Sequence, residues 1–163
     1  MKCGYVAVLG RPNAGKSSLV NFYVGEDVAV VSKRQQTTRS NILGIVTGKD
    51  YQIVFIDTPG IHHSKNELDR FMMKNVRFAI STADVVLYLF DAGKEIDIEE
   101  KDYIEKLREK VDNLIVVKSK IDKEEIADYP CDIKVSIRTN KNTKELLKQI
   151  ISKLPEQEQI FDN

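Results

Sequence analysis

Gly10-Arg11-Pro12-Asn13-Ala14-Gly15-Lys16-Ser17 is the stretch of this sequence that decides the fold. It lies between an apolar run at residues 5–9 (YVAVL) and a segment at residues 17–24 whose apolar residues recur at helical spacing. Its two glycines permit backbone angles that aim N–H groups at phosphate oxygens, and the following helix adds the positive end of its dipole. The order strand, glycine-rich loop, helix predicts a nucleoside triphosphate site, in which Lys16 reaches the β- and γ-phosphates and Ser17 binds Mg²⁺.

The composition is typical of a single globular domain. The chain has 163 residues, and 25 Lys plus Arg balance 25 Asp plus Glu, so the formal net charge is zero and any RNA contact has to be local. The longest apolar run, residues 85–90, is far too short to span a bilayer, and we expect a cytoplasmic protein without an integral membrane segment. Cys3 and Cys131 lack metal-type spacing and are interpreted as reduced, semi-buried thiols.

Apolar runs mostly alternate with helical patterns along the chain. Strands are predicted at residues 5–9, 42–47, 52–56, 85–90, 114–117 and 132–135, and helices at 16–24, 67–81, 98–110 and 144–154. The turn at residues 48–51 is short enough to make its flanking strands an antiparallel hairpin. We therefore predict an α/β three-layer sandwich. Its sheet is six-stranded and mostly parallel, with one antiparallel edge strand and the phosphate site at the carboxyl ends of the strands.

A carboxylate follows the predicted strand at residues 52–56. Asp57 would lie at the carboxyl end of that strand, where it would hold Mg²⁺ through water while Ser17 binds the ion directly. Gly60 can present its N–H to the γ-phosphate, so loss of that phosphate would release the segment that follows. This arrangement is typical of a nucleotide-dependent switch.

The polar stretch at residues 26–40 is interpreted as a mobile surface loop beside the site. It carries Thr38, which we expect to ligate Mg²⁺ and to contact the γ-phosphate only in the triphosphate state. Thr37 is the second candidate for this role.

Residues 119–122, which read Ser-Lys-Ile-Asp, indicate the base. The Asp122 carboxylate can accept the N1 and N2 hydrogens of guanine, whereas adenine offers no such pair of donors. Lys120 would lie along the base and ribose, and a backbone N–H at Ser136-Ile137 would reach guanine O6. The predicted ligands are therefore GTP and GDP.

Five segments together resemble the GTPase domain of the Era family: GRPNAGKSSLVN (10–21), QQTTR (35–39), DTPGIH (57–62), SKID (119–122) and LPEQEQ (154–159). The resemblance covers nearly the whole chain and implies a Ras-like P-loop NTPase fold, GTP hydrolysis with Mg²⁺, and a role in small ribosomal subunit assembly. The residues then expected to act in hydrolysis are Lys16, Thr38 and Gly60. The expected nucleotide-binding residues are Gly10, Arg11, Pro12, Asn13, Ala14, Gly15, Lys16, Ser17, Ser18, Asp57, Gly60, Ser119, Lys120, Asp122, Ser136 and Ile137.

Era proteins continue from the GTPase domain into a KH-type RNA-binding domain, which we expect to be absent from this chain. Residues 1–155 are assigned to the GTP-binding domain and residues 156–163 to a tail or linker. The small ribosomal subunit is thus an expected partner by resemblance only, and direct RNA binding is not carried over to these residues.

The chain departs from the family pattern at two positions of the base site. Ser119 stands where the family usually has Asn, an amide that normally ties the base segment to the phosphate loop, so we expect this tie to be lost, which would lower the affinity. Ile137 stands where the family usually has Ala; it places a larger side chain beside the base and keeps the backbone N–H.

The residue that would position the attacking water is missing from its usual place. Ras-like enzymes commonly orient the attacking water with a Gln at the position of Ile61, which cannot hydrogen-bond water. Era-type GTPases share this hydrophobic residue, and in related members an Asn at the position of Asn13 helps to bind K⁺. The resemblance therefore implies slow hydrolysis that K⁺ accelerates.

Two charged features beside the loop are given ordinary roles. The acidic run at residues 95–100 begins a predicted helix, where the helix dipole favours negative charge, and is interpreted as capping and solvated surface. Arg11 and Arg39 are explained as exposed loop cations as well as by an arginine-finger role, so neither is counted as catalytic.

Three other functions share parts of this pattern. A nucleotide-gated binding module would hydrolyse little GTP alone. A tRNA-modification-type GTPase shares residues 10–19 but needs an acidic catalytic residue after the switch turn, for which Glu67 is the candidate. A small-molecule kinase needs an acceptor pocket and an Arg-rich lid that the sequence lacks, and Asp122 favours guanine.

Overall fold

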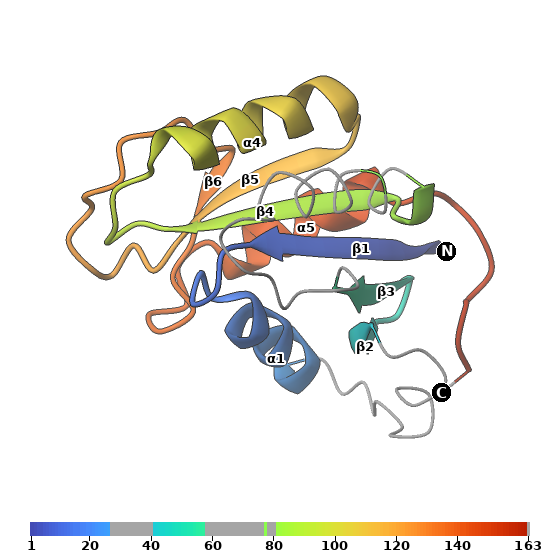
Figure 1. Cartoon of the computed structure of the whole chain (residues 1–163). Coiled ribbons are helices and arrows are strands. Elements are labelled where there is room, and N and C mark those ends of the chain that lie inside the picture. The colour runs from blue at the N-terminus through green and yellow to red at the C-terminus, as the bar shows by residue number, and fades with distance from the viewer. Residues whose placement is uncertain (27–40, 58–76, 78–80, 163) are drawn as a thin grey trace.

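The computed structural model describes residues 1–26, 41–57, 77 and 81–162, and the structural statements below concern these residues. Its centre is a six-stranded sheet in the order β2-β3-β1-β4-β5-β6 (Figure 1). The strands are β1 (Lys2–Gly10), β2 (Ile42–Thr47), β3 (Tyr51–Ile56), β4 (Val85–Asp91), β5 (Leu114–Ser119) and β6 (Ile133–Lys134). The named helices are α1 (Lys16–Glu26), α4 (Ile98–Lys110) and α5 (Thr143–Lys153).

The sheet is parallel except at one edge. β1 lies between β3 and β4 and is parallel to both, and β4, β5 and β6 continue in the same direction. β2 pairs with β3 antiparallel through the short turn between them. The predicted six-stranded sheet with one antiparallel edge strand is therefore confirmed. In such a sheet the carboxyl ends of the parallel strands meet at one edge, where ligands bind.

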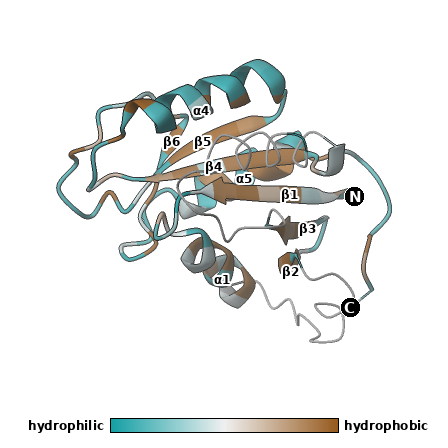
Figure 2. Cartoon of the chain, in the orientation of Figure 1, coloured by the Kyte–Doolittle hydropathy of each residue, from teal (hydrophilic) through white to brown (hydrophobic). Residues whose placement is uncertain are grey.

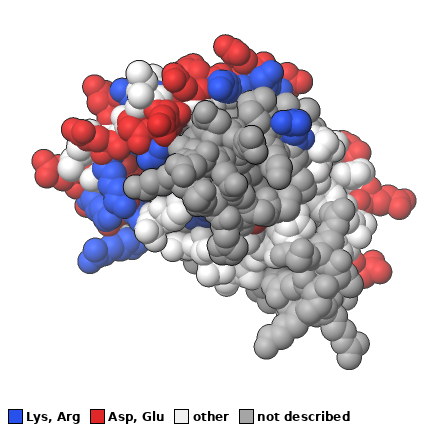
Figure 3. Space-filling view, in the orientation of Figure 1, with Lys and Arg blue, Asp and Glu red and all other residues white. Residues whose placement is uncertain are grey.

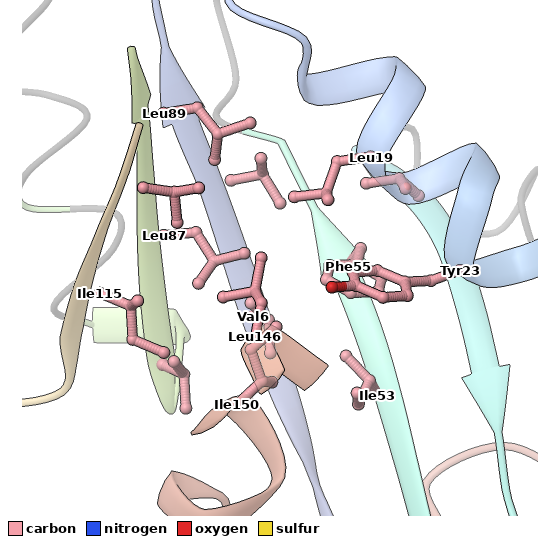
Figure 4. Close-up of a cluster of buried hydrophobic side chains, with 14 of the residues drawn as sticks. Val6, Leu19, Tyr23, Ile53, Phe55, Leu87, Leu89, Ile115, Leu146 and Ile150 are labelled. Atoms are coloured by element: carbon pink, nitrogen blue, oxygen red, sulfur yellow. The ribbon is translucent and has the colours of Figure 1, made fainter. Parts of the chain in front are cut away.

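Alternate residues of each strand serve two hydrophobic cores, one on each face of the sheet. Val6 and Val8 face the core beneath α1 and α5, whereas Ala7 and Leu9 face the core beneath α4. Figure 4 shows the first core, in which side chains of the sheet pack against both helices. The sheet contributes Val6, Phe55 and Leu87, α1 contributes Leu19 and Tyr23, and α5 contributes Leu146 and Ile150. Figure 2 shows the hydrophobic strands inside and a hydrophilic outer surface on α4. The sheet, with α1 and α5 on one face and α4 on the other, forms the predicted three layers.

Most element boundaries lie within two residues of the sequence-based expectation. The exception is β1, which begins at Lys2 rather than at residue 5. The strand expected at residues 132–135 is only two residues long, because the side chain of Asp132 takes over part of the ladder. Its Oδ2 accepts a hydrogen bond from Val116 N at 2.7 Å. The helix expected at residues 67–81 lies mostly outside the described residues. Cys3 is fully buried rather than semi-buried, and Cys131 is half-buried; both are free.

The carboxy-terminal segment at residues 155–161, called the strap below, runs along the start of β1. Cys3 N donates to Pro155 O at 3.0 Å, and Gln157 N donates to Met1 O at 2.9 Å. Gln157 also uses its side-chain amide to donate to Cys3 O at 2.7 Å. The strap thus extends the hydrogen bonding of β1 where that strand has not yet met β4.

Gln52 of β3 holds the far end of the strap. Its side chain is fully buried, and its Oε1 accepts hydrogen bonds from the backbone N–H groups of Ile160 and Phe161, both at 2.9 Å. Its Nε2 donates to Phe161 O at 2.8 Å and to Thr47 Oγ1 at 3.0 Å. Both donor hydrogens and both acceptor lone pairs of this amide thereby have partners.

No helix in the described residues is both long and apolar enough to cross a membrane.

Candidate nucleotide site

The loop between β1 and α1 has the backbone of a phosphate cradle. Gly10 and Gly15 have φ angles of 149° and 100°, which L side chains rarely adopt. A Cβ at Gly10 would also come within 2.6 Å of the Leu89 carbonyl oxygen, so glycine is needed for the close approach to β4. Asn13 has φ 70°, in the left-handed region that Asn tolerates. The loop closes through a hydrogen bond from Ala14 N to Arg11 O at 3.1 Å.

A hollow of about 390 Å³ lies in front of this loop. Lys16, Ser17 and Asp57 line it, together with Pro12, Asn13, Gly15, Ser18 and Lys120. Asp57 arrives there because β3 is parallel to β1 and in register with it, with Ile56 beside Ala7. The Lys16 ammonium donates to Gly10 O at 3.0 Å across the loop. A hydroxyl and a carboxylate are hard oxygen ligands suited to Mg²⁺, and a lysine among backbone N–H groups is suited to phosphate.

A second hollow, of about 350 Å³, shares Gly15, Ser18 and Lys120 with the first. Its lining includes Leu19, Ser119, Asp122, Ile137 and Arg138. The Asp122 carboxylate is held in place by Ser136, whose buried hydroxyl donates to Oδ1 at 2.8 Å. Ile137 is half-buried and packs against the core beneath α1 and α5 while it lines this hollow. An apolar slot that ends in an oriented carboxylate can hold a flat base with paired N–H donors.

The expected loss of the tie between the base segment and the phosphate loop is wrong. Ser119 ends β5, is buried, and donates from its hydroxyl to Ala14 O at 2.6 Å. The carbonyl of Phe90 lies 3.1 Å from the same hydroxyl as a second acceptor. Serine therefore supplies a tie that the sequence pattern assigned to an amide.

Lys120 provides another connection to the phosphate loop. It has φ 60°, and its ammonium donates to Asn13 O. The same ammonium lies 3.3 Å from Asp91 Oδ2. Although burial opposes ionisation, a hydrogen bond from Gly93 N and the charge of Lys120 lower the pKa of Asp91. Lys120 is thus positioned between a loop carbonyl and a buried carboxylate.

Asp91 contacts the site through Lys120, and the sequence reasoning missed it. It is the last residue of β4, and a signal for it exists: a carboxylate directly after an apolar strand, the pattern that identified Asp57. Its pairing with Lys120 has no such signal, because the two residues are far apart in the chain and meet only through the pairing of β4 with β5.

The structure gives Arg11 an ion-pair partner and corrects part of the interpretation of the acidic run. Arg11 lines neither of the two hollows, because its guanidinium is paired with Asp97 at the start of α4. The acidic run does cap the helix, since Asp97 is the N-cap, but Glu100 is buried rather than solvated and accepts a hydrogen bond from Tyr88 OH at 2.6 Å. Burial raises the pKa of Glu100.

Some residues expected at the site lie outside the described residues. They are Thr37, Thr38, Arg39, Gly60, Ile61 and Glu67. Their roles in binding γ-phosphate, ligating Mg²⁺ or positioning water stay predictions.

Comparison with known sequences gives a consistent result. A sequence model of the family described as "50S ribosome-binding GTPase" matches residues 5–120. GTPase Era of Alkaliphilus metalliredigens is 39% identical over 173 residues, which cover 98% of this chain and 59% of that protein. GTPase Era of Clostridium botulinum (strain Eklund 17B) is 45% identical over 121 residues, 74% of this chain and 41% of that protein. The chain thus spans less than two thirds of the length of these relatives.

Solved structures agree on the architecture. A point variant of Aquifex aeolicus Era bound to GDP·AlF₄⁻ superimposes with a TM-score of 0.71 at 31% identity, covering 99% of this chain and 60% of that one. A structure of Era with MgGDPNP and nucleotides 1506–1542 of 16S ribosomal RNA gives a TM-score of 0.72 at the same identity and coverage. The G domain of Thermotoga maritima FeoB, at 23% identity and a TM-score of 0.63, shares the fold.

Proposed function

Because the chain belongs to the Era family of GTPases, we propose that it binds and hydrolyses GTP as a molecular switch in small ribosomal subunit assembly. The observation that carries the proposal is that the two hollows adjoin and share lining residues. Gly15, Ser18 and Lys120 line both, so a single groove runs from a phosphate cradle to the carboxylate of Asp122. A nucleotide with a triphosphate at one end and guanine at the other has this shape and chemistry.

Each end of the groove has a distinct task. Lys16 and the loop N–H groups would neutralise and orient the β- and γ-phosphates, which is most of what phosphoryl transfer requires of a protein. Ser17 and Asp57 would hold Mg²⁺, which when bound would offset the negative charge that develops on the phosphates. Asp122 would select guanine, with Lys120 along the base.

The family resemblance adds a monovalent cation to this proposal. Asn13 lines the phosphate hollow, where its side-chain oxygen would help to hold K⁺. Its left-handed backbone is itself a reason for Asn at this position, so the test must keep that backbone. Asn13→Gly removes the side chain and tolerates the same φ. We expect K⁺ to stimulate hydrolysis in the natural sequence more than in this variant, and equal rates in Na⁺ and K⁺ would exclude the cation role.

A displacement experiment tests the nucleotide assignment. GDP, GTP and ATP would compete with a fluorescent GDP analogue on the natural protein and on Asp122→Asn. We expect displacement by guanine nucleotides alone, lost in the variant. Because an amide can donate to a carbonyl at base position 2, xanthosine diphosphate should regain affinity for the variant. Equal displacement by ATP would show that the groove does not select guanine.

Hydrolysis distinguishes a GTPase from the alternatives. Single-turnover rates would be compared with and without small ribosomal subunits, at saturating Mg²⁺. Turnover by the chain alone supports an enzyme, whereas turnover that appears only with a partner supports a nucleotide-gated binding module. Glu67→Gln tests the tRNA-modification alternative, which predicts that this substitution abolishes modification and spares hydrolysis.

We place the activity in the cytoplasm, which the two free cysteines favour.

A further inference from the structure

Among the described residues, contacts with β4, Ser119, Lys120 and α4 hold the phosphate loop against the rest of the fold. Gly10 abuts β4, Ala14 is held by Ser119, and Asn13 is held by Lys120. The remaining contact joins Arg11 to the amino-terminal end of α4. From this geometry we infer that Asp97 is a positioning residue for the nucleotide site, acting through Arg11 on the first turn of the phosphate loop. This role rests on the proposed function, since it concerns how tightly the loop holds a nucleotide.

The contact between the two side chains is bidentate. Arg11 Nη1 donates to Asp97 Oδ2 at 2.8 Å, and Nη2 donates to Oδ1 at 3.1 Å. Parallel N–H···O bonds of this kind fix direction as well as distance, which a single lysine contact does not. The guanidinium is therefore fixed against the start of α4, and it holds the loop backbone at Arg11 close to that helix.

The carboxylate is itself fixed by the helix. Asp97 is the N-cap of α4, and its Oδ1 accepts a hydrogen bond from Glu100 N at 2.9 Å. That N–H, and then the guanidinium of Arg11, lower the pKa of Asp97, so the carboxylate is charged at neutral pH. The Asp97 side chain therefore cannot change rotamer without losing the hydrogen bond that caps α4.

A buried second layer supports the pair. Arg11 Nε lies 3.8 Å from Glu100 Oε1, and the other oxygen of Glu100 accepts from Tyr88 OH at 2.6 Å. Glu100 is 5% exposed and Tyr88 is 1% exposed. Figure 3 shows acidic side chains gathered over α4, the helix that Arg11 contacts. Arg11 and Glu100 also line a hollow of about 170 Å³ whose lining does not include Lys16 or Ser17.

Partial exposure of the pair limits its effect. The side chains of Arg11 and Asp97 are 42% and 52% exposed, so water and salt screen their attraction. We expect Asp97→Asn to speed GDP dissociation by about two- to fivefold, the range that exposed ion pairs support. The ratio of variant to natural rate should fall towards one in about 1 M NaCl, because the screening length is then about 3 Å.

The variants separate positioning from helix capping. Asparagine is as good an N-cap as aspartate, so Asp97→Asn should leave the melting temperature of the apo protein close to that of the natural sequence. Glu99→Gln removes an exposed negative charge from the same helical turn and is the matched control. Arg11→Gln should raise the dissociation rate similarly, and the double variant with Asp97→Asn should be no faster than either single variant.

The measurement is stopped-flow release of a fluorescent GDP analogue in Mg²⁺ buffer. Failure of the natural sequence to bind the analogue would refute the proposed function itself. If it binds, and Asp97→Asn releases GDP at the rate of Glu99→Gln, the positioning role is refuted. Additive effects of the Arg11 and Asp97 substitutions would also overturn it, since they would show that Arg11 acts on the nucleotide independently.

Discussion

Gln52 offers a quantitative test of how the carboxy-terminal strap is attached to the sheet. Gln52→Leu keeps nearly the same volume and removes the amide. Three hydrogen bonds to the strap backbone are lost, those with Ile160 N, Phe161 N and Phe161 O. At about 1 kcal/mol net for each hydrogen bond, the free energy of unfolding should fall by about 3 kcal/mol. For a domain of this size that corresponds to a melting temperature lower by about 6 to 12 °C.

The loss of stability has a physical ceiling. Ile160 and Phe161 are only half-buried, so in the variant their backbone groups can regain water if the strap detaches. The full penalty for a buried unsatisfied group, which reaches about 3 kcal/mol each, therefore does not apply to all three. Detachment would also expose apolar surface of both side chains, which pack against the core beneath α4. The free energy of unfolding should accordingly fall by more than the loss of a surface hydrogen bond would cost and by less than the loss of the whole core would cost.

Urea unfolding followed by circular dichroism gives the stability, and hydrogen exchange of the Ile160 and Phe161 amides reports on the strap itself. A chain ending at Leu154 is the matched background. Gln52→Leu should be close to neutral there, because the three hydrogen bonds to the strap are already absent. A Gln52→Leu variant of the 163-residue chain that loses less than about 0.5 kcal/mol, or that keeps both amides protected, would refute the reasoning.

Three further predictions concern the groove and its surroundings. Ser119→Ala removes the hydroxyl that donates to Ala14 O and should weaken GDP binding by about five- to tenfold in a fluorescence titration; unchanged affinity would mean that the tie does not support the loop. Asp91→Asn removes the charge beside Lys120 and should speed GDP release in stopped flow, while a slower release would contradict this role. Burial raises the pKa of Glu100 above its usual value of 4.5, so this residue contributes stability at low pH that is lost as the pH rises through its higher folded pKa. In urea unfolding at a series of pH values, Glu100→Gln should therefore gain stability relative to the natural sequence as the pH rises above about 4.5, and the opposite slope would exclude burial as the main influence.

Local patterns in the sequence were enough to predict the sheet. Strand and helix positions depend on short-range periodicity, and the turn at residues 48–51 is too short for any connection other than a hairpin. β6 was predicted at its place but is shorter than expected, because the side chain of Asp132 accepts the hydrogen bond of Val116 N, which no propensity records. The glycine-rich loop and the carboxylate of Asp57 could be identified because their chemistry follows from strand ends and loop composition alone.

The anchors of the site could not be predicted in the same way. Arg11 meets Asp97 across 86 residues, and Gln52 meets Phe161 across 109. Neither pair has a local signature, because an exposed arginine in a loop and a glutamine in a strand each have ordinary explanations. Their partners are determined only when the parallel sheet brings its carboxyl ends together at one edge and the strap returns to the other.

Ser119 shows how this geometry makes a motif tolerant of change. Strand pairing places Ser119 beside Asp91 of β4, and β4 also pairs with the end of β1, from which the phosphate loop begins. The distance between the base segment and the loop is therefore set by backbone hydrogen bonds. A shorter side chain can span it, as the 2.6 Å contact with Ala14 O does, provided that the hydroxyl points at the loop. Lys120, whose ammonium lies beside Asp91, donates to Asn13 O and adds a second connection that does not depend on the residue at 119. A change from amide to hydroxyl at this position consequently alters the strength of one contact and leaves the groove intact.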